Sequence, residues 1–102
     1  MPRYMVVTFA QVDDLPTRPG PPRGPHEFIS EILDALQETV PDVHVGADPS
    51  RTHPSVFFSI ITIVAADGPS AKADAIDKFR DALEGVGMKN PTFDPRQRAI
   101  ED

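Results

Sequence analysis

Apolar and polar positions repeat with two different periods along the chain, and each change of period marks a new element. The segment Tyr4–Val12 is rich in β-branched and aromatic residues and predicts a strand. A short alternation at Val43–Ala47 and a long apolar run at Ser55–Ala65 predict two more strands. Met88–Phe93 is a weaker candidate for a further strand. We therefore expect a sheet of about four strands.

Apolar residues recur at helical spacing in the two segments that separate these strands. Pro25–Thr39 places its apolar residues on one stripe, and a proline at the start suits the first turn of a helix. A second amphipathic segment begins near Asp67 or Ser70, either of which can cap it, and Gly85 and Gly87 end it. The pattern predicts one helix in each segment.

The resulting order is β-α-β-β-α-β, which is typical of the α+β fold called ferredoxin-like or split βαβ. In that fold an antiparallel four-stranded sheet has the strand order 4-1-3-2, and two helices cover one face. The long apolar runs fall on the two central strands, while His44 and Pro91 fall on the edges. We expect one domain over residues 1–94, with a proline-rich loop at 13–25 and a polar tail at 95–102.

Both faces of the two predicted central strands are apolar, whereas a sheet with one face in water normally alternates. We therefore expect a cover over the helix-free face. We predict that the interface is formed by Phe57, Ile61, Ile63, Val7 and Phe9, or by the alternate residues of the same strands. A second copy related by a two-fold axis is the favoured cover. The proline-rich loop or tail of the same chain, and a different protein partner, are the alternatives.

Composition narrows the class of protein further. The chain has 102 residues, of which 39% are hydrophobic and 25% charged, as in globular proteins. The apolar runs are too short for a membrane span and the start lacks a signal pattern, so we expect a cytoplasmic protein without a membrane role. The net charge of −6 argues against nucleic acid as partner. The third strand also lacks the basic and glycine residues of RNA-recognition modules.

Cationic residues of this acidic chain gather in the loops that the topology brings to one end of the sheet. They are Arg18, Arg23, His26, Arg51, His53 and Lys89. The N-terminus of the first helix points to the same end, where its free N–H groups favour negative charge. One hypothesis is an anion site for a carboxylate or phosphate. The alternative, which we favour, is ordinary solvated charges paired with nearby aspartates.

Residues for catalysis or cofactor binding follow no familiar pattern. The sequence has no phosphate-binding loop, dinucleotide fingerprint or metalloprotease motif. It has no cysteine, and His26, His44 and His53 lack the spacing of a zinc site, so we expect neither metal nor cofactor. The proline-rich loop contains PxxP spacings, which suit a ligand of aromatic grooves but are better explained as a stiff connector.

Two interpretations of function remain open. The first is a small non-catalytic interaction or assembly module that self-associates through the helix-free face of its sheet. The second is a small cofactor-independent enzyme, or a small-anion-binding protein, of the dimeric α+β barrel type with its site at the loop end. In that case His26 or His53 would act as acid or base, and Tyr4 or an arginine would orient the substrate. The sequence alone identifies no substrate and no named partner.

Overall fold

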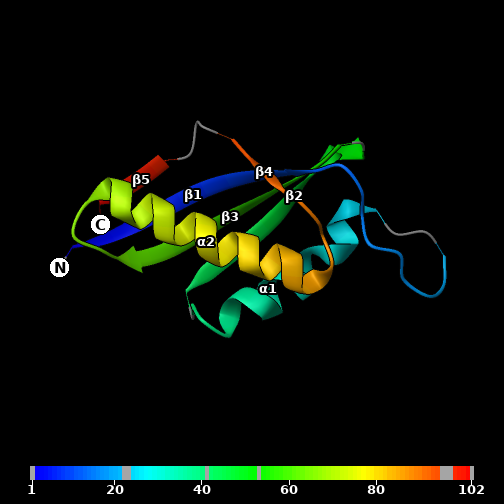
Figure 1. Ribbon diagram of the computed structural model, residues 1–102, viewed down its shortest axis with the longest axis horizontal. Helices are drawn as coiled ribbons and strands as arrows, with labels where there is room; N and C mark the ends of the chain where they lie inside the picture. The colour runs from blue at the N-terminus through cyan, green and yellow to red at the C-terminus, as the bar shows by residue number, and fades with distance from the viewer. Residues whose placement is uncertain (1, 22–23, 41, 53, 95–97, 102) are drawn as a thin grey trace.

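The computed structural model describes residues 2–21, 24–40, 42–52, 54–94 and 98–101, without the side chains of residues 51 and 52. The elements are β1 (Arg3–Val12), the 3-10 turn η1 (Pro25–Phe28), α1 (Ile29–Gln37), β2 (Val43–Thr52), β3 (Ser55–Val64), α2 (Gly68–Val86), β4 (Thr92–Phe93) and β5 (Arg98–Glu101). Figure 1 shows the two helices in front of a twisted sheet. The structure confirms an α+β chain in which two helices pack on a mostly antiparallel sheet.

The sheet has the order β2-β3-β1-β4, and β5 also pairs with β1. β1 and β3 form the long central pair, in which every residue from Arg3 to Val12 has a partner in β3. β4 pairs antiparallel with the end of β1, opposite Ala10 and Gln11. β5 pairs antiparallel with the beginning of β1, opposite Tyr4 to Val7. One edge of β1 is therefore lined by two short strands in succession.

β5 differs from the expectation that residues 95–102 form a polar tail. Arg98–Glu101 is a strand because the first half of β1 otherwise leaves its outer N–H and C=O groups without partners. Ala99 pairs with Val6, and Ile100 pairs with Met5. The local signal is only two apolar residues between charged ones, and the pairing partner lies at the other end of the sequence. A local pattern carries little information about such a contact.

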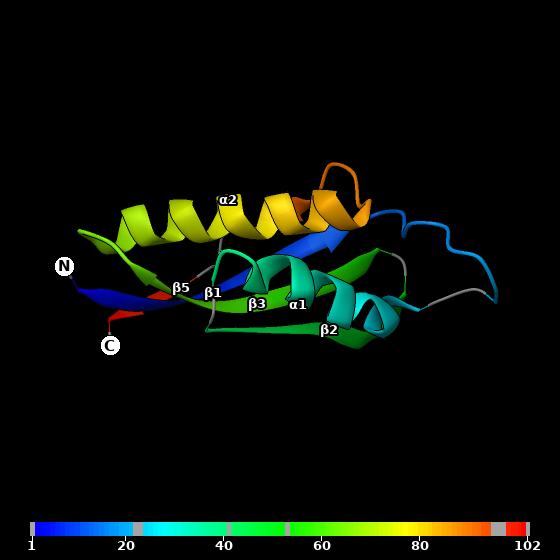
Figure 2. The ribbon, with the colours of Figure 1, turned by 90° about the horizontal axis from the view of Figure 1, so that it is seen from below.

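The second helix begins and ends as the sequence predicts. The Asp67 carboxylate accepts a hydrogen bond of 2.8 Å from the backbone N–H of Ser70, which caps the N-terminus. Gly87 ends the helix with φ of 107°, a left-handed conformation that glycine adopts without steric cost. Its N–H and that of Met88 bond back to the carbonyls of Glu84 and Leu83. α2 is 19 residues long and spans the sheet (Figure 2).

One face of the sheet and the apolar stripes of both helices form the core. On β1 the alternate residues from Tyr4 to Val12 are buried, and on β3 those from Ser55 to Ile63 are buried. The registers place these two sets on the same face, against the helices. The largest fully buried side chains include Phe28, Phe57 and Phe79. α1 and α2 lie on this single face, so no helix of the described residues covers the opposite face of the sheet (Figure 2).

Candidate functional site

The helix-free face is the sheet surface formed by the remaining alternate residues of β1, β3 and β5 and by the facing residues of β2. Its apolar members are Met5, Val7, Phe9, Val56, Phe58, Ile60, Val64 and Ile100. Val64 is 55% exposed, Ile100 49%, Met5 41% and Phe9 38%. These fractions show that the described segments of loop and tail do not cover the face within one chain. Exposed apolar area of this extent typically marks an interaction or ligand site.

Cross-strand pairing arranges this face in rows that run from one edge of the sheet to the other. One row contains Arg98, Val7, Ile60 and His44, which are neighbours on β5, β1, β3 and β2. The apolar middle of the row is therefore flanked by an arginine at one edge and a histidine at the other. The next row ends at the β2 edge, where the Thr62 hydroxyl donates a 3.2 Å hydrogen bond to the Asp42 carboxylate.

Three residues fill the middle of the face in a continuous contact. Phe9 is paired with Phe58, and their ring centroids lie 6.1 Å apart at a tilt of 48°. Phe58 is in turn paired with Gly46 on β2, and its ring occupies the space beside the glycine Cα. Aromatic pairs of this kind stabilise sheets beyond their apolar area. The centre of the helix-free face is thus an aromatic platform of fixed shape.

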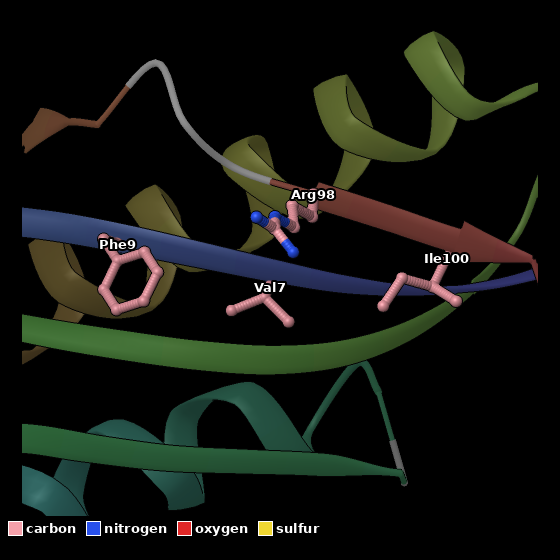
Figure 3. A pocket seen from close by; sticks show the side chains of 4 residues that line it. All are labelled: Val7, Phe9, Arg98 and Ile100. Atoms are coloured by element: carbon pink, nitrogen blue, oxygen red, sulfur yellow. The ribbon is translucent and has the colours of Figure 1, made fainter.

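A depression of about 510 Å³ lies beside this platform, at the edge of the face formed by β5. Its lining side chains are those of Val7, Phe9, Arg98 and Ile100. Figure 3 shows that these side chains come from β1 and β5 and project from the same side of the sheet. Sequence reasoning missed Arg98 and Ile100, because residues 98–101 were expected to be tail. The alternation Arg-Ala-Ile-Glu was the available signal.

The predicted interface residues divide between the two faces of the sheet. Val7 and Phe9 lie on the helix-free face. The structure corrects the assignment of Phe57, Ile61 and Ile63, which lie in the core beneath the helices. The pattern could not show which face the helices cover, because both sets of β3 residues are apolar. The set on the open face is the alternate one, which contains Val56, Phe58, Ile60 and Val64.

Arg18, one of the predicted anion-site residues, has partners of its own. Its guanidinium donates a 2.6 Å hydrogen bond to the carbonyl of Val86 and a 3.1 Å hydrogen bond to the carboxylate of Glu31. It also lies over the Phe28 ring, 5.5 Å from the centroid. A cation at the C-terminal carbonyls of α2 is favoured by the helix dipole. Arg18 therefore joins the first loop to both helices, which is a structural role.

The other predicted cations of this end converge only in part. Arg18 and Lys89 line a groove of about 660 Å³ together with Asp13 and Asp14, so the groove has mixed charge. His26 is exposed in η1. Gly24, the N-cap residue of η1, already donates a 2.9 Å hydrogen bond from its backbone N–H to the Glu27 carboxylate. Residues Arg23 and His53, and the side chain of Arg51, lie outside the described part of the chain. The anion site at this end stays a prediction.

Tyr4, considered above as an orienting residue, lies on the helix side of β1 and is only 9% exposed. Burial raises the pKa of its phenol, and the carboxylates of Glu101 and Asp67 raise that pKa further. Tyr4 therefore holds its proton at neutral pH. Within the described residues, no group of three or more metal-ligating side chains comes together. Likewise, no described helix is both long and apolar enough to cross a membrane.

Comparison with known proteins gives no further guide to this site. Family models, curated proteins and solved structures yield no match to the chain. The helix-free face, with its apolar rows, aromatic centre and flanking arginine, is the surface of this chain that bears on function.

Proposed function

We propose that the chain is an assembly module that forms a dimer through its helix-free face. The main support for the dimer is the apolar surface of β1, β3 and β5. In the single chain this surface is exposed to solvent at Met5, Phe9, Val64 and Ile100. Water contact with such a surface is unfavourable, and burial contributes roughly 25 cal/mol per Å² of apolar area. A second sheet laid against it removes that area from water. This is the non-catalytic interpretation of the sequence.

The fold suits face-to-face pairing of two copies. We infer a split βαβ, or ferredoxin-like, domain in which β4 and β5 together take the place of a single fourth strand. Both pair antiparallel with β1, at different stretches of the same edge. With the helices on one side, the other side of such a domain is a broad, gently twisted surface. Two such surfaces pack about 10 Å apart with interdigitating side chains.

A two-fold axis makes the same patch serve both partners. The commonest soluble oligomers are dimers with two-fold symmetry, because one self-complementary surface is sufficient. A stable interface of ordinary size buries about 800 Å² on each partner. The aromatic platform of Phe9 and Phe58 lies at the centre of the face, where well-packed aromatic anchors contribute most to affinity. We therefore place the centre of the dimer at this pair.

Light scattering coupled to size-exclusion chromatography tests the dimer directly. We expect the wild-type chain to run as a dimer and Phe9→Lys to run as a monomer, because the lysine places an unpaired charge in the interface. Ala73→Lys is the matched control, since Ala73 is exposed on α2 and lies outside the face. Circular dichroism establishes that both variants remain folded. A wild-type monomer at high micromolar concentration would contradict the proposal.

The enzyme interpretation has no comparable support. His26, one of its two candidate acid–base residues, is exposed, and its imidazole has no hydrogen-bond partner among the described residues. Arg18 contacts Val86 and Glu31, so it is not available to orient a substrate. The observation that points toward a ligand lies elsewhere, on the helix-free face beside β5.

A further inference from the structure

The described lining of the depression on the helix-free face combines apolar side chains with the positive charge of Arg98. Val7 is half-buried, while Phe9 and Ile100 are 38% and 49% exposed. Arg98, which pairs with Val7 across the strands, is exposed at the same place. The volume of about 510 Å³ falls in the range of small-molecule sites. The depression therefore has the dimensions and the composition of a ligand site.

Arg98 has no counter-charge in the described part of the chain. No hydrogen bond or ion pair joins Arg98 to another described side chain. Glu101, the acidic residue of the same strand, lies on the helix side of the sheet. The neighbours of Arg98 on the face are apolar. If a second sheet covers the face, the guanidinium loses water as well, and a charge without a partner is costly in such surroundings. An anion bound beside it removes that cost.

We propose that this depression binds a small organic acid, with its carboxylate on the Arg98 guanidinium and its apolar body against Val7, Phe9 and Ile100. The inference deepens the proposed function and rests on it in one respect, since the second sheet of the dimer encloses the ligand. The planar guanidinium donates two parallel hydrogen bonds to a carboxylate. Phosphate carries more charge and requires more donors than Arg98, the one arginine among the described lining residues, supplies. The net charge of −6 also disfavours the binding of multiply charged anions.

Octanoate is a suitable probe, because it joins one carboxylate to a flexible apolar chain. The methyl resonances of Val7 and Ile100 are followed by NMR during a titration of the full chain. We expect saturable shifts with octanoate and much weaker effects with 1-octanol, which has the same chain without the charge. Equal binding of both molecules, or no shift at these methyl groups, overturns the proposal.

Substitution of the arginine tests the charge from the side of the protein. Arg98→Gln should weaken octanoate binding about tenfold or more, because a charge-assisted pair is lost. Arg80→Gln is the matched control, since it removes the same charge at a place outside the depression, where Arg80 lies over the Phe93 ring on the helix side. Unchanged affinity in Arg98→Gln overturns the proposal.

Light scattering on the same samples separates this proposal from that of the dimer. If the chain is a monomer and binds octanoate through Arg98, the result supports the ligand site and overturns the proposed dimer. A dimer that shows no binding overturns the site alone. If Arg98→Gln dissociates the dimer without any added acid, then the counter-charge of Arg98 is a carboxylate of the partner chain. That outcome also overturns the ligand site.

Discussion

The ring of Phe58 lies against Gly46 of the neighbouring strand, in the space that a β-carbon on residue 46 would occupy. Glycine is otherwise a poor strand residue, because it lacks a side chain to pack and loses much conformational freedom on folding. An aromatic ring laid across it restores packing on that face and fixes the strand register. The ring also contacts Phe9, so Gly46 indirectly positions the centre of the proposed interface.

Gly46→Ala should therefore destabilise the protein and disturb the helix-free face. The added methyl group forces the Phe58 ring away, and we expect a loss of about 1–3 kcal/mol in the free energy of unfolding. Urea denaturation measures the loss, and the ring resonances of Phe9 and Phe58 should shift. Gly85→Ala is the control of opposite sign, because Gly85 lies within α2 with open space around its Cα. That variant should gain about 0.5–1 kcal/mol. A gain for both variants would contradict the packing role of Gly46.

Thr8 and Ser59 form a cross-strand pair in the middle of the core face, and both are completely buried. Their hydroxyl oxygens have no hydrogen-bond partner among the described residues. A buried hydroxyl without a partner costs free energy that an apolar group of the same shape does not. Thr8→Val should therefore raise the free energy of unfolding by about 1 kcal/mol.

Thermal and urea denaturation of two matched variants test this expectation. Thr62→Val makes the same change on β3, where the hydroxyl does donate a hydrogen bond to Asp42. We expect no gain there, because the substitution removes that bond. If Thr8→Val proves less stable than the wild type, the hydroxyl takes part in a hydrogen bond within the core and the premise is wrong.

Most of the fold follows from local sequence patterns, but β5 does not. The caps at Asp67 and Gly87 and the two long strands are recognisable because their signals lie within a few neighbouring residues. β5 is not recognisable, because its stability depends on the free edge of β1, more than 90 residues away in sequence. Non-local pairing of a short strand leaves little local signal.

The candidate site shows the same limit in a different form. Sequence reasoning indicated an apolar second face but could not tell which of the two β3 sets lies on it. Phe57 and Phe58 are adjacent aromatic residues, and a shift of register by one residue exchanges their faces. The helix stripes do not resolve this, since either set would satisfy them. Arg98 could be recognised as part of the site only after β5 was placed.

Arg18 illustrates how a sequence-predicted binding residue can have a structural role. The guanidinium reaches the carbonyl of Val86 and the carboxylate of Glu31 at once, with Phe28 beneath it. Arg18→Lys keeps the charge but cannot keep this planar arrangement. We expect a loss of about 1–2 kcal/mol in the free energy of unfolding, measured by urea denaturation. Arg80→Lys, at an exposed pair with Asp77, should change stability by less than about 0.5 kcal/mol. Equal losses would show that Arg18 acts only as a surface charge.

Asp67 gives α2 a pH-dependent N-terminal cap. The hydrogen bond from the backbone N–H of Ser70 lowers the pKa of the Asp67 carboxyl below its usual 3.8, and the Ser70 side chain lowers it further. A carboxyl whose pKa is lower in the folded state contributes stability that is present above its unfolded pKa. This contribution is lost as the pH falls below about 3.8 and through the lower folded pKa.

Comparison of Asp67→Asn with the wild type isolates this effect, because asparagine still caps the helix but does not titrate in this range. Melting temperatures measured from pH 7 to pH 2 should show a wild-type advantage near neutrality, where the carboxylate also interacts with the helix dipole. The advantage should shrink as the pH falls and disappear at the acid end of the series. Asp67→Ala, which removes the cap, should melt below both at neutral pH. A difference between wild type and Asp67→Asn that stays constant with pH would contradict a role for the charge, leaving the cap as a neutral hydrogen-bond acceptor only.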